Sequence, residues 1–168
     1  VLVQDMNGCQ GGIATTVLQP NAPDLTLAGS TNVSCNGQSD GSAVTAVSGG
    51  QSPFTYTLNG GSSQSTGTYS NLGAGSYTIQ ITDASGCTDT QPVTITEPSA
   101  VTLAFISDID ANCSGSDGSL TVSGAGGTGT LHYSLNGGTS QTSPTFGSLP
   151  GGLYTIQVVD DNGCSAAV

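Results

Sequence analysis

The feature that most constrains the fold is a phrase that the chain contains three times. "YTIQITDASGC" spans 77–87, "YTIQVVDDNGC" spans 154–164, and a shorter version, "VLVQDMNGC", spans 1–9. The copies recur about every 77 residues, and the block from Gly41 to Cys87 aligns with the block from Gly118 to Cys164 without a gap. This period is too long for ordinary solenoid repeats and long enough for a small domain with its own core. The sequence therefore predicts a tandem array.

Two proline-containing stretches mark the boundaries of the repeats. "LQPNAP" and "TEPSA" stand at the same phase of the period, and proline disfavours continuation of a strand, so we expect both to be linkers. We predict that residues 1–20 are the C-terminal part of a preceding repeat and that residues 21–98 are a complete repeat. Residues 99–168 are expected to be a repeat that lacks most of its last strand.

Between the copies of the phrase, short apolar runs alternate with turns rich in Gly, Asn and Ser. "SAVTAV", "FTYTL" and "YTIQIT" have the alternation of half-buried strands, and turns such as "NGG" and "DASG" separate them. Six or seven such strands at intervals of roughly ten residues are typical of an antiparallel sandwich. We therefore predict an all-β chain of immunoglobulin-like or fibronectin-like antiparallel β-sandwich domains, joined end to end.

One strand of each repeat predicts a core face, because its apolar side chains alternate with polar ones. The residues on this face are Tyr77, Ile79 and Ile81 in one copy and Tyr154, Ile156 and Val158 in the other. Before each tyrosine stand a leucine and a Gly-rich corner, the arrangement found before strand F of immunoglobulin-like sandwiches. We expect each tyrosine to pack in the core and to form one hydroxyl hydrogen bond. Tyr69 and Phe146 are expected to be core residues too.

The charge balance excludes several classes of partner. The chain has eleven acidic residues, no Lys and no Arg, and its formal net charge is −11. Nothing is available to neutralise the phosphates of a nucleic acid or to bind anionic lipid by charge. No apolar run of about 18 residues exists, so we expect no membrane insertion. The acids must be solvated, accept hydrogen bonds from backbone N–H groups, or bind a cation.

Residues suited to catalysis are scarce, and we predict that the protein is not an enzyme. The single histidine, His132, is replaced by Thr55 in the other copy, which is typical of a structural or surface residue. General acid–base chemistry would then need paired carboxylates. The acids that do recur, Asp83 with Asp160 and Asp40 with Asp117, stand beside glycine turns, where we expect them to cap backbone N–H groups.

Calcium is the one cofactor for which the sequence offers candidate ligands. "DIDANCSGSDG" and "VVDDNG" gather several carboxylates, and calcium takes several oxygen ligands. The candidate ligands are Asp108, Asp110, Asp117, Asp160 and Asp161. Neither run is an EF-hand loop. If calcium binds, we expect it at the domain joints near Glu97 and Asp108, where it would stiffen the array.

Each repeat contains two cysteines, which for a small unit of secreted type predicts disulfides. The within-repeat pairs Cys35–Cys87 and Cys113–Cys164 are the simplest pairing, and Cys9 would have its partner outside these residues. In a strict immunoglobulin-like topology, however, Cys35 and Cys87 would lie at opposite poles. A bond across a domain joint and the pair Cys87–Cys113 therefore remain alternatives.

The motifs of each repeat follow one another in a fixed order. In the complete repeat they are Cys35, Gly37 and Asp40–Ser42; Gly49, Gly50 and Pro53–Tyr56; Leu72, Gly75, Tyr77–Ile81, Asp83, Gly86 and Cys87; and Val93–Pro98. This order resembles the SprB-type repeat of Bacteroidota cell-surface gliding adhesins. The next copy departs from the pattern at 129–131, where Gly, Thr and Leu replace a segment with a proline and an aromatic residue.

The resemblance implies an extracellular, cell-surface protein exported by type IX secretion, whose repeats form long adhesin filaments that move along the cell during gliding motility. It implies no catalytic residues. We therefore predict a structural segment of such a filament, a stalk for cell adhesion; an array of polysaccharide-binding modules is the alternative. The partners expected are neighbouring repeats of the same chain, other chains by lateral self-association, and surface or glycan ligands bound through regions outside these residues.

Overall fold

The computed structural model describes residues 2–12, 21–113 and 115–168, and the regular structure of these residues is entirely β. The strands are β1 (Leu2–Gln4), β2 (Gln10–Gly12), β3 (Pro23–Thr31), β4 (Gly41–Gly49), β5 (Thr55–Leu58), β6 (Thr68–Leu72), β7 (Gly75–Thr82), β8 (Thr88–Ile95), β9 (Thr102–Ile109), β10 (Gly118–Ala125), β11 (His132–Leu135), β12 (Thr145–Leu149), β13 (Ile156–Val159) and β14 (Ser165–Ala167).

Strands β3–β14 form two units with one topology. In the first unit, β3–β8, the sheets have the orders β3-β4-β6 and β5-β7-β8; in the second, β9–β14, the orders are β9-β10-β12 and β11-β13-β14. Every pairing is antiparallel. The prediction of repeated antiparallel sandwiches is confirmed, whereas the finer immunoglobulin-like assignment stays a prediction. The boundaries predicted after residues 20 and 98 stay predictions too, and the second falls between β8 and β9.

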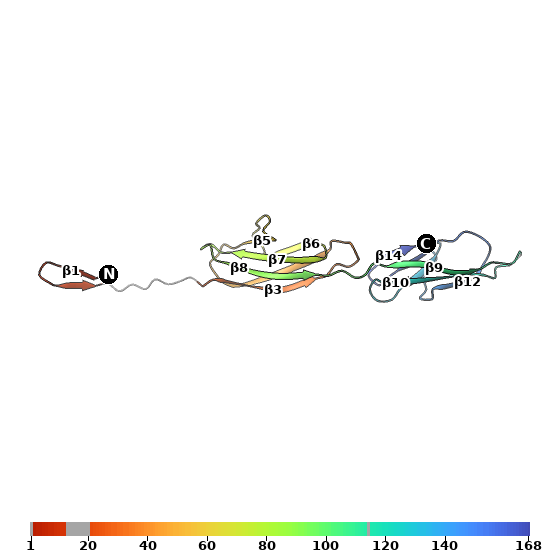
Figure 1. The fold of residues 1–168 in the computed structure, drawn as a ribbon, viewed down its shortest axis with the longest axis horizontal. Coiled ribbons are helices and arrows are strands. Elements are labelled where there is room, and N and C mark those ends of the chain that lie inside the picture. Colours follow the sequence, from red (N-terminus) through yellow and green to blue (C-terminus); the bar gives the residue numbers. More distant parts are fainter. Residues whose placement is uncertain (1, 13–20, 114) are drawn as a thin grey trace.

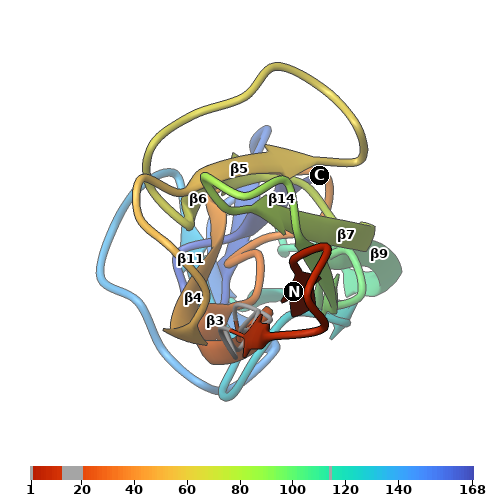
Figure 2. The same ribbon diagram turned by 90° about the vertical axis from the view of Figure 1, so that its left-hand side faces the viewer.

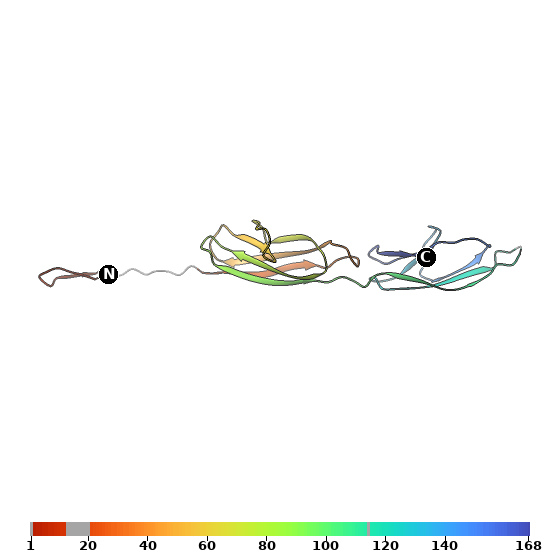
Figure 3. The ribbon, with the colours of Figure 1, turned by 45° about the horizontal axis from the view of Figure 1, so that its top comes forward.

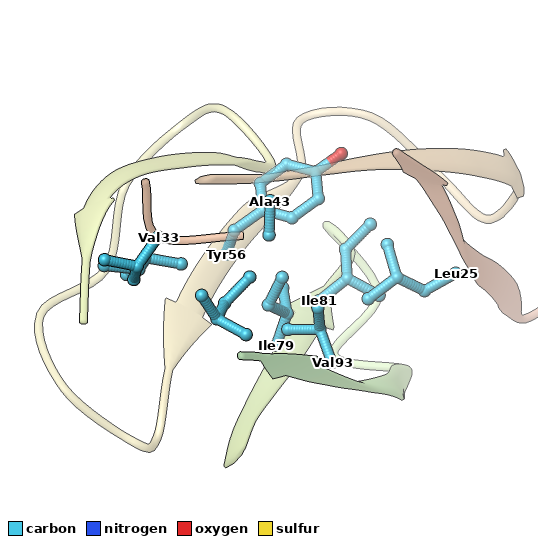
Figure 4. Close-up of a cluster of buried hydrophobic side chains, with 9 residues drawn as sticks. Leu25, Val33, Ala43, Tyr56, Ile79, Ile81 and Val93 are labelled. Atoms are coloured by element: carbon cyan, nitrogen blue, oxygen red, sulfur yellow. The ribbon is translucent and has the colours of Figure 1, made fainter. Parts of the chain in front are cut away.

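Each unit buries its own cluster of apolar side chains. The cluster of the first unit is Leu25, Val33, Ala43, Tyr56, Leu72, Ile79, Ile81, Val93 and Ile95. That of the second is Val122, Tyr133, Phe146, Ile156 and Val158. Ile79 and Ile81 of β7 are fully buried; they face Ala43 of the opposite sheet and pack beside Tyr56 of β5, the neighbouring strand in their own sheet (Figure 4). The predicted core face is therefore confirmed for these isoleucines, and Tyr77 packs half-buried against the same cluster.

The two units lie end to end, and their strands follow the long axis of the molecule (Figures 1 and 3). In the view along that axis, strands of the second unit such as β9 and β14 lie behind those of the first (Figure 2). Strands β3 and β8 both run from the far pole of the first unit toward the second unit. Both poles of a unit are consequently built from loops and turns, and the units meet pole to pole.

The first strand of the repeat ends before Cys35. Strand β3 ends at Thr31, and the loop 32–40 then crosses the pole. Val33 of this loop is buried and its backbone N–H donates to the carbonyl of Thr96, 3.0 Å away. Asp40 closes the loop by accepting from the backbone N–H of Ser34 at 3.0 Å. The loop is thus fastened to the end of β8.

Gly41, which follows the capping Asp40, has no room for a side chain. A Cβ placed on it would lie 2.7 Å from Cγ2 of Ile95 and 2.8 Å from the carbonyl oxygen of Leu72. The equivalent Gly118 would meet the carbonyl oxygen of Leu149 at 2.8 Å. The glycine of the "DGS" motif is therefore required by close approach of β4 to its neighbours.

Gly41→Ala is expected to destabilise the first unit by about 1–3 kcal/mol, because the added methyl group overpacks a site bounded by backbone. Gly29→Ala in β3 is the matched control, since no atom lies within 4 Å of its added Cβ. We expect the control to be neutral or slightly stabilising. Chemical denaturation of the two variants measures the difference, and equal stabilities would contradict the expectation.

Candidate functional site

The structurally distinctive part of the chain is the joint between the two units. We define the joint as the linker 96–101, the loop 32–40 of the first unit, and the turn 160–164 with the glycine pair Gly126 and Gly127 of the second. The linker has no regular structure, and it connects the end of β8 to the start of β9. The loop and the turn face each other across it.

A disulfide between Cys35 and Cys164 closes the joint. The two Cα atoms are 5.6 Å apart, and the bond joins residues separated by 129 positions. Cys9, Cys87 and Cys113 are unpaired among the described residues. The predicted pairs Cys35–Cys87 and Cys113–Cys164 are therefore wrong. The bond that forms is of the alternative kind, across a domain joint.

Cys35 and Cys87 do not pair because the direction of the strands places them at opposite poles of the unit. Cys35 lies in the loop fastened to the end of β8, whereas Cys87 lies in the turn just before β8 begins. The eight residues of β8 separate the two by roughly 25 Å. A disulfide needs Cα atoms no more than about 7 Å apart, so the two cysteines of one unit do not meet. Cys164, at the pole of the second unit that faces the first, does meet Cys35.

Hydrogen bonds hold the linker from both sides. On the first unit, the side-chain Nδ2 of Asn36 donates to the carbonyl of Pro98 at 3.2 Å, and the backbone N–H of Gly37 donates to Oε2 of Glu97 at 2.6 Å. On the second unit, the N–H of Gly127 donates to the carbonyl of Ser99 at 2.9 Å. The linker is therefore fixed to both units.

Direct contact between the units adds to the disulfide. Nδ2 of Asn162 donates to the carbonyl of Ser34 at 3.1 Å. An open crevice runs beside the bond, and residues of both units line it without any charged side chain. The chemistry that this arrangement shows is that of a covalent fastening.

The turn that carries the cysteine is built around a buried aspartate. Oδ1 of Asp160 accepts from the backbone N–H groups of Asn162 and Cys164 at 2.9 and 2.8 Å, and Oδ2 accepts from that of Thr128 at 2.7 Å. Burial alone would raise the pKa of Asp160, but these backbone donors outweigh it and hold the pKa below the ordinary value of 3.8.

The same turn occurs in the other copies of the phrase. Asp83 accepts from the backbone N–H groups of Ser85 and Cys87 at 2.8 and 2.9 Å and from that of Gln51 at 3.0 Å. Burial again raises and the backbone donors lower its pKa, with a net lowering. In the hairpin β1–β2, Asp5 accepts from the N–H of Cys9 at 2.9 Å. The prediction that these acids cap turns is confirmed.

The lowered pKa values predict loss of stability in acid. Because Asp83 and Asp160 have pKa values below those of the unfolded chain, their stabilising effect is present above about pH 4 and is lost as the pH falls through their folded pKa. In Asp83→Asn, one of the two oxygens that accept these three hydrogen bonds becomes an N–H₂ donor, so we expect a lower melting temperature at neutral pH and a smaller further loss in acid. Asp24→Asn, at an exposed position, is the control. Identical pH profiles for all three proteins would contradict the expectation.

The structure does not bring the five candidate calcium ligands together. Asp108 and Asp110 lie at the end of β9 that points away from the joint, and Oδ1 of Asp117 accepts from the backbone N–H of Asn112 at 2.8 Å. Asp160 and Asp161 belong to the turn at the opposite pole. In the described residues, no three His, Cys, Asp or Glu side chains form a cluster able to hold a metal ion. Calcium binding stays a prediction, and it has no geometric support.

His132 lies half-exposed on β11, and its Nε2 is 3.2 Å from Oδ1 of Asp161. Asp161 also accepts from the backbone N–H of Thr130 at 2.9 Å. These two interactions hold the bend at 129–131, where the second unit has neither the proline nor the aromatic residue of the first. The histidine thus has a local structural partner at the position where the first unit has Thr55.

Comparison with known families connects this geometry to a known repeat. Residues 28–63 match the family model of the SprB repeat. The chain carries a SprB-type repeat. The matched residues run from within β3 through the loop with Cys35, β4 and β5 into the loop that follows β5, so they include the loop 32–40 of the joint. A SprB repeat indicates an adhesin-type repeat region of a cell-surface protein, and the repeat is a structural one. No curated protein matches the chain.

The aromatic residues of the SprB-type repeat are structural. The hydroxyl of Tyr77 donates to the carbonyl of Gly73 at 3.0 Å, and that of Tyr154 donates to the carbonyl of Pro150 at 2.6 Å. The predicted hydroxyl hydrogen bond of each tyrosine is therefore confirmed in both units. Phe146 is buried, and Tyr69 packs against the first core. No helix in the described part of the chain is long and apolar enough to cross a membrane.

Proposed function

We propose that the chain is a segment of the shaft of a secreted adhesin filament, in which SprB-type repeats hold an adhesive region away from the cell surface and, in gliding cells, take part in movement. The observation that carries the proposal is the joint: two sandwiches meet pole to pole, and a disulfide and linker hydrogen bonds on both sides fix them. A spacer needs defined length and stiffness, and a joint fixed in this way would supply the stiffness.

The strands set the length of each segment. Nine residues of β3 extend about 30 Å along the molecular axis, so a repeat contributes at least this much to the length of a filament. The net charge of −11, without a single Lys or Arg, favours repulsion between neighbouring shafts and solubility of the array. Neither feature needs a ligand.

Among the residues that the structure describes, no specific site favours the polysaccharide-binding alternative. An open apolar groove of about 230 Å³ is lined by residues that include Phe105, Leu153 and Tyr154 of the second unit. In the first unit, the end of β8 covers the equivalent place with the buried side chains of Val93 and Ile95. The groove therefore reflects the short β14 rather than a binding site that the repeat reproduces.

The proposal is tested on intact cells that produce the protein. Antibodies raised against the 168-residue chain, with immunogold detection, should decorate filaments at the cell surface without permeabilisation. Labelling that requires permeabilisation would contradict a surface shaft. Binding of the chain to a glycan array, together with surface labelling in patches without filaments, would favour the polysaccharide-binding alternative.

The stiffness of the joint is tested separately, by small-angle X-ray scattering of the chain with and without a reductant. The oxidised chain is expected to scatter as an elongated particle with one inter-unit angle, and reduction is expected to broaden the distribution of distances between the units. A broad distribution in the oxidised chain would remove the observation on which the shaft proposal depends.

A further inference from the structure

We infer that Cys87 and Cys113 each form a disulfide equivalent to the Cys35–Cys164 bond, and that the partner cysteine lies in a further copy of the same repeat. The inference rests on the proposed shaft of tandem repeats and names the partner of its exposed poles. In the resulting array, the two cysteines of one repeat are bonded to different neighbours and never to each other. Every joint is then closed covalently.

Cys113 occupies in the second unit the position that Cys35 occupies in the first. It follows β9 as Cys35 follows β3, and an aspartate closes each loop by accepting from the backbone N–H of the preceding residue. The two hydrogen bonds, from Ser34 to Asp40 and from Asn112 to Asp117, have lengths of 3.0 and 2.8 Å. Cys113 is exposed in the loop between β9 and β10.

Cys87 occupies in the first unit the position that Cys164 occupies in the second. Both cysteines end a turn with the same aspartate cap, and in each turn the aspartate N–H donates to the cysteine carbonyl, at 2.9 Å in the first unit and 3.0 Å in the second. The position of the thiol is therefore fixed by the same backbone hydrogen bonds in the bonded and unbonded copies.

The pole around Cys87 also binds a linker in the same way as the joint does. The N–H of Gly50 donates to the carbonyl of Asn21 at 3.1 Å, as the N–H of Gly127 donates to the carbonyl of Ser99 at 2.9 Å. In both cases the glycine has a positive φ, 67° for Gly50 and 72° for Gly127. A linker held at this place delivers a preceding repeat to the same pole.

Two side-chain contacts of the observed joint are not reproduced by the sequence. Asn162, whose amide reaches the carbonyl of Ser34, corresponds to Ser85, and Asn36, whose amide reaches the carbonyl of Pro98, corresponds to Ser114. The docking surface common to all joints therefore consists of the cysteine turn and the glycine pair on one repeat and the cysteine loop on the other.

Bond formation converts two thiols to one disulfide with release of two protons and two electrons. A disulfide such as oxidised glutathione accepts these by thiol–disulfide exchange and is reduced to two thiols.

A lengthened chain tests the inference directly. A second copy of residues 21–98 is inserted after Pro98, which preserves the phase of the linkers, and Thr88→Ser in the inserted copy marks its Cys87 peptide by mass. Thr88 is exposed. After oxidation in a glutathione buffer, free thiols are alkylated, and the chain is cleaved with a protease specific for Asp and Glu, because it has no Lys or Arg. Mass spectrometry then identifies the disulfide-linked peptides.

The inferred pattern leaves the original Cys87 alkylated and bonds the marked Cys87 to a Cys35 peptide, while Cys164 stays bonded to the other Cys35 peptide. The bond at Cys164 reports that the inserted copy folds. Bonding of the original Cys87 to a Cys35 peptide, or alkylation of the marked Cys87, would overturn the inference. Either result would leave surface filaments, on which the proposed function is tested, unaffected.

The 168-residue chain provides a second measurement that does not depend on the insertion. At high concentration in the same buffer, we expect covalent multimers that link Cys113 of one molecule to Cys87 or Cys9 of another. Cys113→Ser should abolish these multimers and retain the Cys35–Cys164 bond. Monomers only, or multimers that persist in Cys113→Ser, would overturn the inference.

Discussion

Reduction of the Cys35–Cys164 disulfide is expected to lower the stability of each unit by about 4 kcal/mol, although the bond lies between the units. While the first unit is folded, its pole holds Cys35 close to Pro98 through Asn36 and Gly37. An unfolded second unit would then be a closed loop of about 65 residues, and closing such a loop removes roughly this much chain entropy from the unfolded state. The same reasoning applies to the first unit when the second is folded.

Denaturant unfolding of the oxidised chain and of Cys35→Ser measures this effect. Cys87→Ser is the matched control, because Cys87 has no partner among the described residues and its replacement leaves the joint intact. We expect Cys35→Ser to unfold at a clearly lower denaturant concentration and the control to unfold as the parent does. A Cys35→Ser variant as stable as the oxidised parent would show that the bond constrains nothing in the unfolded chain.

Ile79→Ala is expected to cost the first unit about 2–5 kcal/mol. The side chain is fully buried among Ala43, Tyr56 and Ile81, so truncation loses apolar burial and leaves a cavity (Figure 4). Ile106→Ala removes the same atoms from a side chain that is 58% exposed, and it should change stability by well under half as much.

The comparison also tests whether the cores are independent. Because the two buried clusters share no residue, Ile79→Ala should lower the unfolding transition of the first unit and leave a separate transition of the second. Thermal unfolding followed by calorimetry distinguishes the two. A single transition that moves as a whole would contradict independent cores.

Much of this fold was predictable because the same short sequence patterns, each typical of one local structure, occur in both repeats. The alternation in "YTIQIT" predicted the buried isoleucines, and the placement of Asp83 and Asp160 before glycines predicted the caps. The glycine corner before Tyr77 predicted its hydroxyl hydrogen bond. Each of these features depends on neighbours within a few positions, or on the faces of one strand, and these are what sequence patterns record.

The disulfide partner of Cys35 could not be chosen from the sequence, because the repeats offer equivalent cysteines at more than one place in the chain. A bond from Cys35 to Cys87 and a bond from Cys35 to Cys164 both join a loop cysteine to a phrase-end cysteine, and they differ only by one period. What decides between them is that β3 and β8 run toward the same pole, so that the turn before β8 lies at the other. The need for glycine at Gly41 was hidden likewise, since it depends on Ile95 and Leu72.

The route of the sulfur bridge determines how the chain would bear mechanical tension. A pull on its two ends passes from Asn21 along β3 to Cys35, crosses to Cys164 and leaves through β14, so the 129-position separation between the cysteines is bypassed. Strand β3 is already close to its full extension. Drawing the ends apart would therefore yield almost no slack, and the greater part of both sandwiches would carry no load.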